Sequence, residues 1–211
     1  MRIAVVGANG RTGRLVVEQA LARGHGVTAL ARQPQQSSRR DQRLTTVEVD
    51  VLDRGRVVDA LSEVDAVIST LGIGTSREAT VTYSQGTGNL LHAMGLHGTK
   101  RIVVVAASPV GPRQDQAAFD RYVVMPILER FFGATYQDMR RMEALLAESG
   151  TDWTSLRPPR LVEKPPVGGY RISPGRPLPK ARTLTYADLA TSLIDALNRD
   201  DLRRRAAYVA N

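Results

Sequence analysis

Short apolar runs alternate with helical stretches along the first two-thirds of the chain. The apolar runs show little of the every-second-residue alternation of a half-exposed strand, and uninterrupted runs of this kind are typical of parallel strands buried on both faces. Apolar positions three and four residues apart between them predict amphipathic helices. The pattern predicts strands at 2–6, 27–31, 44–50, 66–69, 101–106 and 153–156, and helices at 11–23, 53–61 and 84–95. Strands that alternate with helices favour right-handed crossovers. The predicted fold is therefore α/β, a doubly wound (Rossmann) and mostly parallel sheet with helices on both faces.

The last third of the chain has a different texture. Residues 116–148 predict a long helical region that is interrupted near Pro126 and Gly133, and seven of the eleven prolines follow between Pro158 and Pro179. Such a stretch forms neither a continuous helix nor a central strand. Because a helix (186–197) and a short strand (207–210) are predicted after it, we interpret 158–180 as an ordered loop region on the substrate side. The whole chain, 1–211, is expected to be a single domain.

Composition narrows the class of protein. Hydrophobic residues make up 42% of the 211, charged residues 24%, and no apolar run approaches the length of a membrane helix or a signal peptide. We therefore expect a cytoplasmic protein with no membrane partner. The absence of cysteine excludes disulfides, thiolate catalysis and cysteine-based metal sites, and the three histidines are scattered, so no metal is predicted.

The formal net charge of +8 raises the question of nucleic-acid binding. The basic clusters are few and have no aromatic residues between them; they lie at 39–40, 140–141 and 203–205. We therefore regard a nucleic-acid partner as unlikely, and attribute the charge to an arginine-rich surface and to pockets for an anionic cofactor. The sequence leaves a monomer and a dimer open.

A glycine triplet gives the most specific chemical signal. Gly7, Gly10 and Gly13 stand directly after a predicted strand and before a predicted helix. In this context the first glycine permits a tight turn, the second lets the backbone approach a pyrophosphate, and the third lets the helix pack on the strand. The N–H groups at the start of the helix then face the phosphates. The predicted cofactor-binding residues of this loop are Gly7, Asn9, Gly10, Arg11, Thr12 and Gly13; the alternative is a glycine-rich turn without a ligand.

The end of the second strand favours NADP(H) over NAD. An NAD site expects an acidic residue there for the ribose hydroxyls, whereas this strand ends at Arg32 with no acid nearby. Arg32, and Arg11 in the loop itself, are suited to a 2′-phosphate because guanidinium groups match phosphate geometry. The alternative for Arg32 is a solvated strand end. Asp50, after the third strand, is either an acceptor for the adenine amino group or part of a surface turn.

Several of these segments resemble one known family. The motifs lie at 5–13, 27–32, 50–51, 65–68 and 148–150, with further likeness at 156–159 and 168–170. They are similar to the atypical short-chain dehydrogenases, and within these to the NmrA-like NAD(P)-binding proteins, which include NADPH-dependent flavin reductases of the biliverdin reductase B type. The resemblance covers almost the whole chain. It is specific for the cofactor and uninformative about the substrate.

The resemblance assigns roles to individual residues. It implies that Arg32 contacts the 2′-phosphate and the adenine side, and that Asp50 and Val51 frame the adenine. Further residues would follow the cofactor toward the nicotinamide: Thr70, Leu71 and Gly72 along its path, Ser108 beside the ring and Pro159 closing over it. Where those flavin reductases have a histidine after the Pro-Pro pair, this chain has Arg160. The difference argues against tetrapyrrole reduction, and makes Arg160 a candidate for holding an anionic substrate or the cofactor pyrophosphate.

A catalytic acid is not evident. Classical short-chain dehydrogenases use Tyr-x-x-x-Lys on a helix, whereas here Tyr136 is followed four residues later by Arg140, which is not equivalent to lysine. We interpret Tyr136 and Arg140 as a pair on the helix surface. Ser108 remains the one candidate catalytic residue; the alternative is a capping serine before Pro109.

The leading hypothesis is an NADPH-dependent oxidoreductase that transfers hydride to a flat conjugated small-molecule acceptor of the flavin or quinone type. Such acceptors can take their proton from water, so no strong acid is needed. The alternative is a non-enzymatic NADP(H)-binding redox sensor or regulator of the NmrA-like type. A sugar-nucleotide epimerase is a weaker third hypothesis, because those enzymes need the tyrosine–lysine pair and a larger C-terminal domain.

Overall fold

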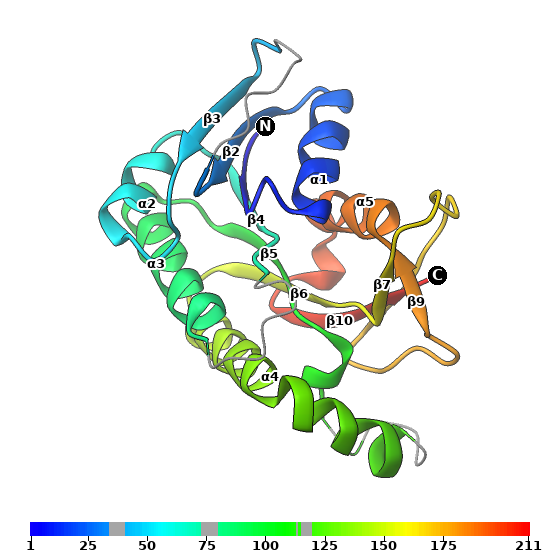
Figure 1. Ribbon diagram of the computed structural model, residues 1–211. Coiled ribbons are helices and arrows are strands. Elements are labelled where there is room, and N and C mark those ends of the chain that lie inside the picture. The colour runs from blue at the N-terminus through cyan, green and yellow to red at the C-terminus, as the bar shows by residue number, and fades with distance from the viewer. Residues whose placement is uncertain (34–40, 73–79, 113, 115–119) are drawn as a thin grey trace.

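The centre of the molecule is an eight-stranded sheet with the order β3-β2-β1-β4-β5-β6-β10-β8 (Figure 1). All neighbouring strands are parallel except β8, which pairs antiparallel with β10. The computed structural model describes residues 1–33, 41–72, 80–112, 114 and 120–211. The strands of this sheet are β1 (Arg2–Val6), β2 (Gly26–Ala31), β3 (Leu44–Glu48), β4 (Ala66–Ser69), β5 (Arg101–Val105), β6 (Asp152–Arg157), β8 (Arg171–Pro174) and β10 (Arg205–Ala210). The predicted doubly wound α/β fold is confirmed.

Helices cover both faces of the sheet, and each face has its own core (Figure 1). The helices are α1 (Arg11–Ala22), α2 (Arg54–Ala60), α3 (Thr82–His97), α4 (Met125–Glu148) and α5 (Tyr186–Ala196). Helices α1 and α5 pack together on one face around Val16, Leu189 and Leu193, whereas α2, α3 and α4 cover the other around Leu90, Met142 and Leu146. Within the described ranges, none of the helices has the length and apolar character of a membrane span.

The order of the strands locates a ligand-binding crevice. The chain builds outward from β1 through β2 to β3, then returns to place β4 on the other side of β1. Because the crossovers after β1 and β4 run in opposite directions, the loops after these two strands diverge at their carboxyl ends, which is the position of the ligand-binding crevice in open α/β sheets. The glycine loop follows β1 directly, so it lies at this crevice.

Two predictions about the last third need correction. Helix α4 runs without a break through Gly133, and Pro126 lies in its first turn, where a proline costs no hydrogen bond. A π-helical turn, Asp120–Val124, leads into it. The cost of about 1 kcal/mol for a glycine inside a helix is therefore outweighed by tertiary packing.

The proline-rich region is ordered but is not only loop. It contains β7 (Arg160–Val162), which pairs in parallel with β9 (Thr183–Thr185) to form a second, two-stranded sheet, and it contains β8. Pro174 is accommodated in β8 because that strand is at the edge of the large sheet. We call residues 158–183 the acceptor-side segment, after the substrate-side position that the sequence predicts for them.

Candidate functional site

The phosphate loop has the geometry that its glycines predict. Gly7 has a φ of 77°, and a Cβ there would lie 2.9 Å from the carbonyl oxygen of Thr70. A Cβ on Gly13 would lie 2.2 Å from the carbonyl oxygen of Gly7, a separation that no side chain can have. The backbone N–H groups of Gly7 and Ala8 both donate to the carbonyl of Leu30 at 3.1 Å, which fixes the loop to the end of β2. Helix α1 is therefore packed against β1 as closely as a backbone allows.

The start of α1 is left available to an anion. The helix begins after Gly10, which offers no side-chain cap, and its first turn contains no acidic residue. The amide of Gly10 itself donates to the carbonyl of Gly7 at 2.9 Å. An uncapped helix N-terminus with glycines on the approach suits a pyrophosphate, because amide donors and the positive end of the helix dipole point to the same place. These residues fit a dinucleotide.

Thr70 joins the two strands that border the crevice. Its hydroxyl donates to the carbonyl of Val6 at 2.8 Å and lies 3.3 Å from that of Gly7, and its amide also donates to Val6. Leu71 is half-buried, whereas Gly72 is exposed with open space where a Cβ would be. The predicted path of the cofactor after β4 is therefore bounded by backbone and small side chains. Residues 73–79, which follow, lie outside the described residues.

On the predicted adenine side, Asp50 and Val51 have different surroundings. Asp50 is exposed, and one oxygen of its carboxylate accepts from the amide of Leu52 at 3.0 Å, which leaves the other oxygen for a ligand. Val51 is buried, and its carbonyl accepts from the side-chain amide of Asn89 at 2.9 Å. Both the turn and the acceptor interpretation of Asp50 are compatible with this geometry.

The two arginines proposed for the 2′-phosphate point to different neighbours. Arg32 is exposed immediately after β2, beside Gln33, whose carbonyl accepts from the side chain of Asn9. Arg11 instead lies over the ring of Tyr186, 5.6 Å from its centre, and 3.5 Å from the carboxylate of Glu163 in the acceptor-side segment. Arg32 thus lies at the end of β2, where the sequence predicts the adenosine side, and Arg11 connects the phosphate loop with the acceptor-side segment.

Ser108 begins a short 3₁₀ turn, Ser108–Val110, after β5. Its hydroxyl donates to the carbonyl of Arg157 at 3.1 Å, and its amide donates to the carbonyl of Pro158 at 2.8 Å. The half-buried hydroxyl can therefore accept a hydrogen bond from a ligand in this conformation, but must leave Arg157 before it can donate one. Pro159 is half-buried and Arg160 is exposed at the start of β7, directly beyond this contact.

Tyr136 and Arg140 do not form an activated pair. Burial raises the pKa of Tyr136, and the positive charge of Arg140 offsets this only in part. The Arg140 guanidinium donates to the carbonyl of Pro109 at 3.2 Å and pairs with Glu129 at 3.4 Å. It lines an open hollow of about 550 Å³ next to the Ser108 turn, together with Val110, Gly111, Pro112, Glu129 and Arg157. The phenol is therefore poorly suited to give up its proton at neutral pH.

A family model described as NAD(P)H-binding matches residues 7–200, from the first glycine of the phosphate loop to a point beyond α5. The chain belongs to this NAD(P)H-binding family. The resemblance to the atypical short-chain dehydrogenases is thereby confirmed at the level of the family.

Individual relatives are distant. An uncharacterized chloroplastic protein of Arabidopsis thaliana is 30% identical over 82% of this chain, and a 3-diazoavenalumate denitrifying reductase of a Streptomyces species is 29% identical over 71%. This chain spans 64% and 52% of their lengths. The fold is shared with a short-chain dehydrogenase/reductase of Veillonella parvula in complex with NADP, which has a TM-score of 0.82, 16% identity, and coverage of 100% of this chain and 94% of that one.

Two residues that the sequence analysis did not single out pack beneath the candidate cofactor site, on α3 and α4. Gly86, inside α3, approaches Val51 and Leu71 so closely that a Cβ would lie 2.9 Å and 3.2 Å from their side chains. Asp138 of α4 is fully buried and accepts from the amide of Tyr83 at 2.9 Å at the start of α3. A glycine inside an otherwise helical pattern was the available signal for Gly86. The role of Asp138 depends on contact between two helices and has no local signal.

A second buried carboxylate organises the acceptor side. Asp188 accepts hydrogen bonds from Thr185 at 2.7 Å, from the amide of Val167 at 3.0 Å and from Asn211 at 2.9 Å. Asn211 also donates to the carbonyl of Gly169 at 2.8 Å. Burial acts to raise the pKa of Asp188, but these hydrogen bonds outweigh it and the pKa is lowered. The middle of the acceptor-side segment is therefore fastened to the start of α5.

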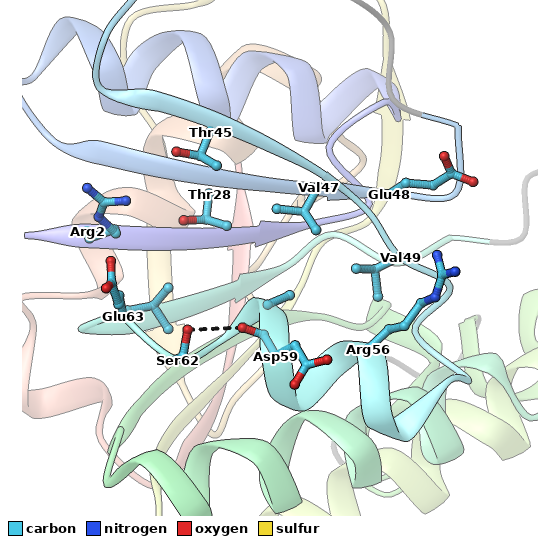
Figure 2. Close-up of a pocket in the computed structure, with 12 residues that line it drawn as sticks. Arg2, Thr28, Thr45, Val47, Glu48, Val49, Arg56, Asp59, Ser62 and Glu63 are labelled. Carbon is cyan, nitrogen blue, oxygen red and sulfur yellow. Dashed lines mark hydrogen bonds between the residues drawn. The ribbon is translucent and has the colours of Figure 1, made fainter.

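A groove of about 400 Å³ lies apart from these residues, between β2 and β3 and helix α2 (Figure 2). Figure 2 shows Glu48 and Arg56 toward one end of it and Arg2 and Glu63 toward the other. Its lining is of mixed charge and includes none of the predicted site residues. We therefore place the functional site at the phosphate loop and the Ser108 turn rather than in this groove. In the described parts of the chain, no group of three potential metal-ligating side chains is found.

Proposed function

We propose that this NAD(P)H-binding protein is an NADPH-dependent reductase of flat conjugated acceptors of the flavin or quinone type. The observation that carries the proposal is the combination of a complete phosphate cradle with an acceptor side where none of the described residues is an activated acid. The cradle is formed by Gly7, Gly13 and the uncapped start of α1. A bound nicotinamide cofactor supplies the hydride.

The absence of an activated acid limits which acceptors are suitable. The Ser108 hydroxyl already donates to Arg157, and burial raises the pKa of Tyr136. Reduction of a simple ketone needs a proton at the nascent alkoxide. The Ser108 hydroxyl would have to leave Arg157 to give one, and the phenol of Tyr136 lacks the lysine that activates the tyrosine in classical short-chain dehydrogenases. A flavin or quinone delocalises the incoming electron pair, so solvent can supply the proton. The overall reaction consumes NADPH, one proton and the oxidised acceptor, and yields NADP⁺ and the two-electron-reduced acceptor.

Preference for NADPH rests on Arg32. It is exposed at the end of β2, where NAD-specific proteins carry an acidic residue for the ribose. The related fold from Veillonella parvula is a complex with NADP, and one relative is named as a reductase. Both agree with the proposal.

The experiment is NADPH oxidation by purified protein against a panel of flavins and quinones, with NADH in parallel. We expect turnover with at least one acceptor, and a preference for NADPH. Binding of NADPH without turnover on any acceptor would favour the second candidate, a redox sensor. That candidate is supported by the same lack of an activated acid, because a sensor needs a cofactor site but no proton donor.

A further inference from the structure

The positive charge of this protein is concentrated in the acceptor-side segment. Residues 158–183 contain one acidic residue, Glu163, and six basic ones: Arg160, Lys164, Arg171, Arg176, Lys180 and Arg182. This segment, about an eighth of the chain, therefore carries five of its eight net positive charges. All six basic residues are exposed. The single acid is 3.5 Å from Arg11, so its charge is shared with a cation outside the segment.

The segment holds these charges in a fixed place. Its first residue, Pro158, accepts from the amide of Ser108 at 2.8 Å, and its middle is bound to Asp188 and Asn211. The guanidinium of Arg171 holds the last part of the segment, because it donates to the carbonyls of Pro179 and Asn211 at 2.9 Å each. The exposed cations are thus presented by a tethered surface, rather than by a free tail.

Two of them lie near the Ser108 turn through the pairing of β7 with β9. In the two-stranded sheet, Arg160 lies opposite Thr183, and Arg182 is the residue before Thr183. Arg160 is also two residues after Pro158, at the Ser108 turn. Arg160 therefore starts β7 and Arg182 directly precedes the neighbouring strand β9, close along the chain to the candidate acceptor position at the Ser108 turn. Lining a crevice with charges of one sign raises the local concentration and association rate of ligands of the opposite sign.

We infer that the acceptor is itself an anion, with a phosphate or carboxylate that lies against the start of β7 and β9 while its conjugated ring lies at the Ser108 turn. The inference rests on the proposed function for the ring, but the anion contact is measurable without turnover. A polyanion such as nucleic acid is the less favoured ligand. Tyr170 is the one aromatic residue in the segment, and it is half-buried against the core that lies under α1 and α5, so bases have little to stack on.

The test compares FMN with riboflavin, which share the redox ring and differ by the phosphate. Binding is followed by flavin fluorescence in the presence of NADP⁺, which prevents turnover, and NADPH-dependent reduction is measured separately. The variant is Arg160→Glu/Arg182→Glu. The matched control is Lys100→Glu/Arg205→Glu, which makes the same charge change at two exposed positions. Lys100 directly precedes β5 and Arg205 is the first residue of β10, so both lie at the amino ends of these strands, whereas the Ser108 turn follows the carboxyl end of β5.

For the wild type we expect FMN to bind about tenfold or more tightly than riboflavin, with a preference that weakens as salt is raised. The Arg160/Arg182 variant should lose this preference and keep its riboflavin and NADPH affinities within about twofold, whereas the control should keep the preference. Equal affinity of the wild type for FMN and riboflavin overturns the inference, even if both are reduced. The inference is also overturned if the Arg160/Arg182 variant loses NADPH affinity as strongly as FMN affinity, because the two cations would then belong to the cofactor site. Binding of a short DNA duplex through Arg160 and Arg182 without any FMN preference also overturns it. If FMN is preferred in binding but no flavin is reduced, the anion site stands and the proposed function fails.

Discussion

The phosphate loop and the acceptor-side segment border the same crevice but are built in different ways. The loop is defined by backbone contacts, since Gly10 and Gly13 both close onto the carbonyl of Gly7, and the loop is tied to the backbone at the ends of β2 and β4 through Leu30 and Thr70. The acceptor-side segment is held from a distance, by Asp188 on α5, by Asn211 after β10 and by Ser108 after β5. One half is fixed by backbone geometry, and the other largely by side chains of remote elements. This contrast explains why the family is evident and the acceptor is not.

The largest effect should follow from a methyl group in the loop. In Gly13→Ala, the Cβ would lie 2.2 Å from the carbonyl of Gly7, so α1 must move away from β1. We expect a loss of about 3 kcal/mol in the free energy of unfolding and at least about 100-fold weaker NADPH binding, measured by denaturation and fluorescence titration. Gly95→Ala, at an exposed position of α3 with open space around it, is the control and should be stabilised by about 0.5–1 kcal/mol. Intact NADPH affinity in Gly13→Ala would contradict the close helix packing.

Loss of the Asp188 charge should rank second. Asp188→Asn places an amide donor against groups that themselves donate, and should lower the stability by about 2 kcal/mol, or the Tm by about 4–8 °C. Because the folded-state pKa of Asp188 is lowered, its stabilisation is present above its unfolded pKa of about 3.9 and is lost as the pH falls through the folded value. The Tm difference between wild type and variant should therefore narrow on acidification below about pH 4. The control is Asp41→Asn, whose carboxylate forms a local pair with Arg43. A Tm difference that stays constant at low pH would show that the charge is not what holds the segment.

A smaller effect is expected from Arg32→Asp, on the ratio of the affinities for NADPH and NADH. Arg32→Asp replaces the proposed partner of the 2′-phosphate with the acidic residue expected for NAD. We expect NADPH to bind about 10- to 50-fold more weakly, with NADH unchanged or tighter, in parallel titrations. An unchanged ratio of the two affinities would remove Arg32 from the site.

The smallest effect is predicted for Tyr136→Phe. Because burial raises the pKa of this phenol and Arg140 is engaged with Pro109 and Glu129, the hydroxyl has no part in the proposed reaction. Turnover with a flavin should change by less than about twofold. A drop of 100-fold or more in kcat with unchanged NADPH affinity would instead make Tyr136 a proton donor.

The phosphate loop could be predicted from the sequence, whereas the contacts that hold the acceptor-side segment could not. The loop, α1 and the inner strands follow from local apolar patterns and glycine spacing, and their boundaries were predicted to within about two residues. Helix α4 was predicted to break at Gly133 on local propensity alone. It continues through Gly133, because the packing of the helix as a whole outweighs that propensity. The strands inside 158–180 were missed because their partners, β9 and β10, are remote or lie beyond the region. Asp138 and Asp188 gave no signal, since a buried carboxylate is recognised by the donors around it and not by its neighbours in sequence.

The proposed reaction is hydride transfer from NADPH to a conjugated acceptor. The most direct measurement is an anaerobic single turnover, in which stoichiometric NADPH and FMN are mixed with excess protein and the absorbance of both is followed. Transfer from NADPH carrying deuterium at one face of C4 reports whether the protein selects a face. We expect loss of NADPH absorbance in step with flavin bleaching, faster than without protein and with an isotope effect for one face only. Tight NADPH binding with flavin reduction no faster than in free solution would contradict it and assign the protein as a sensor.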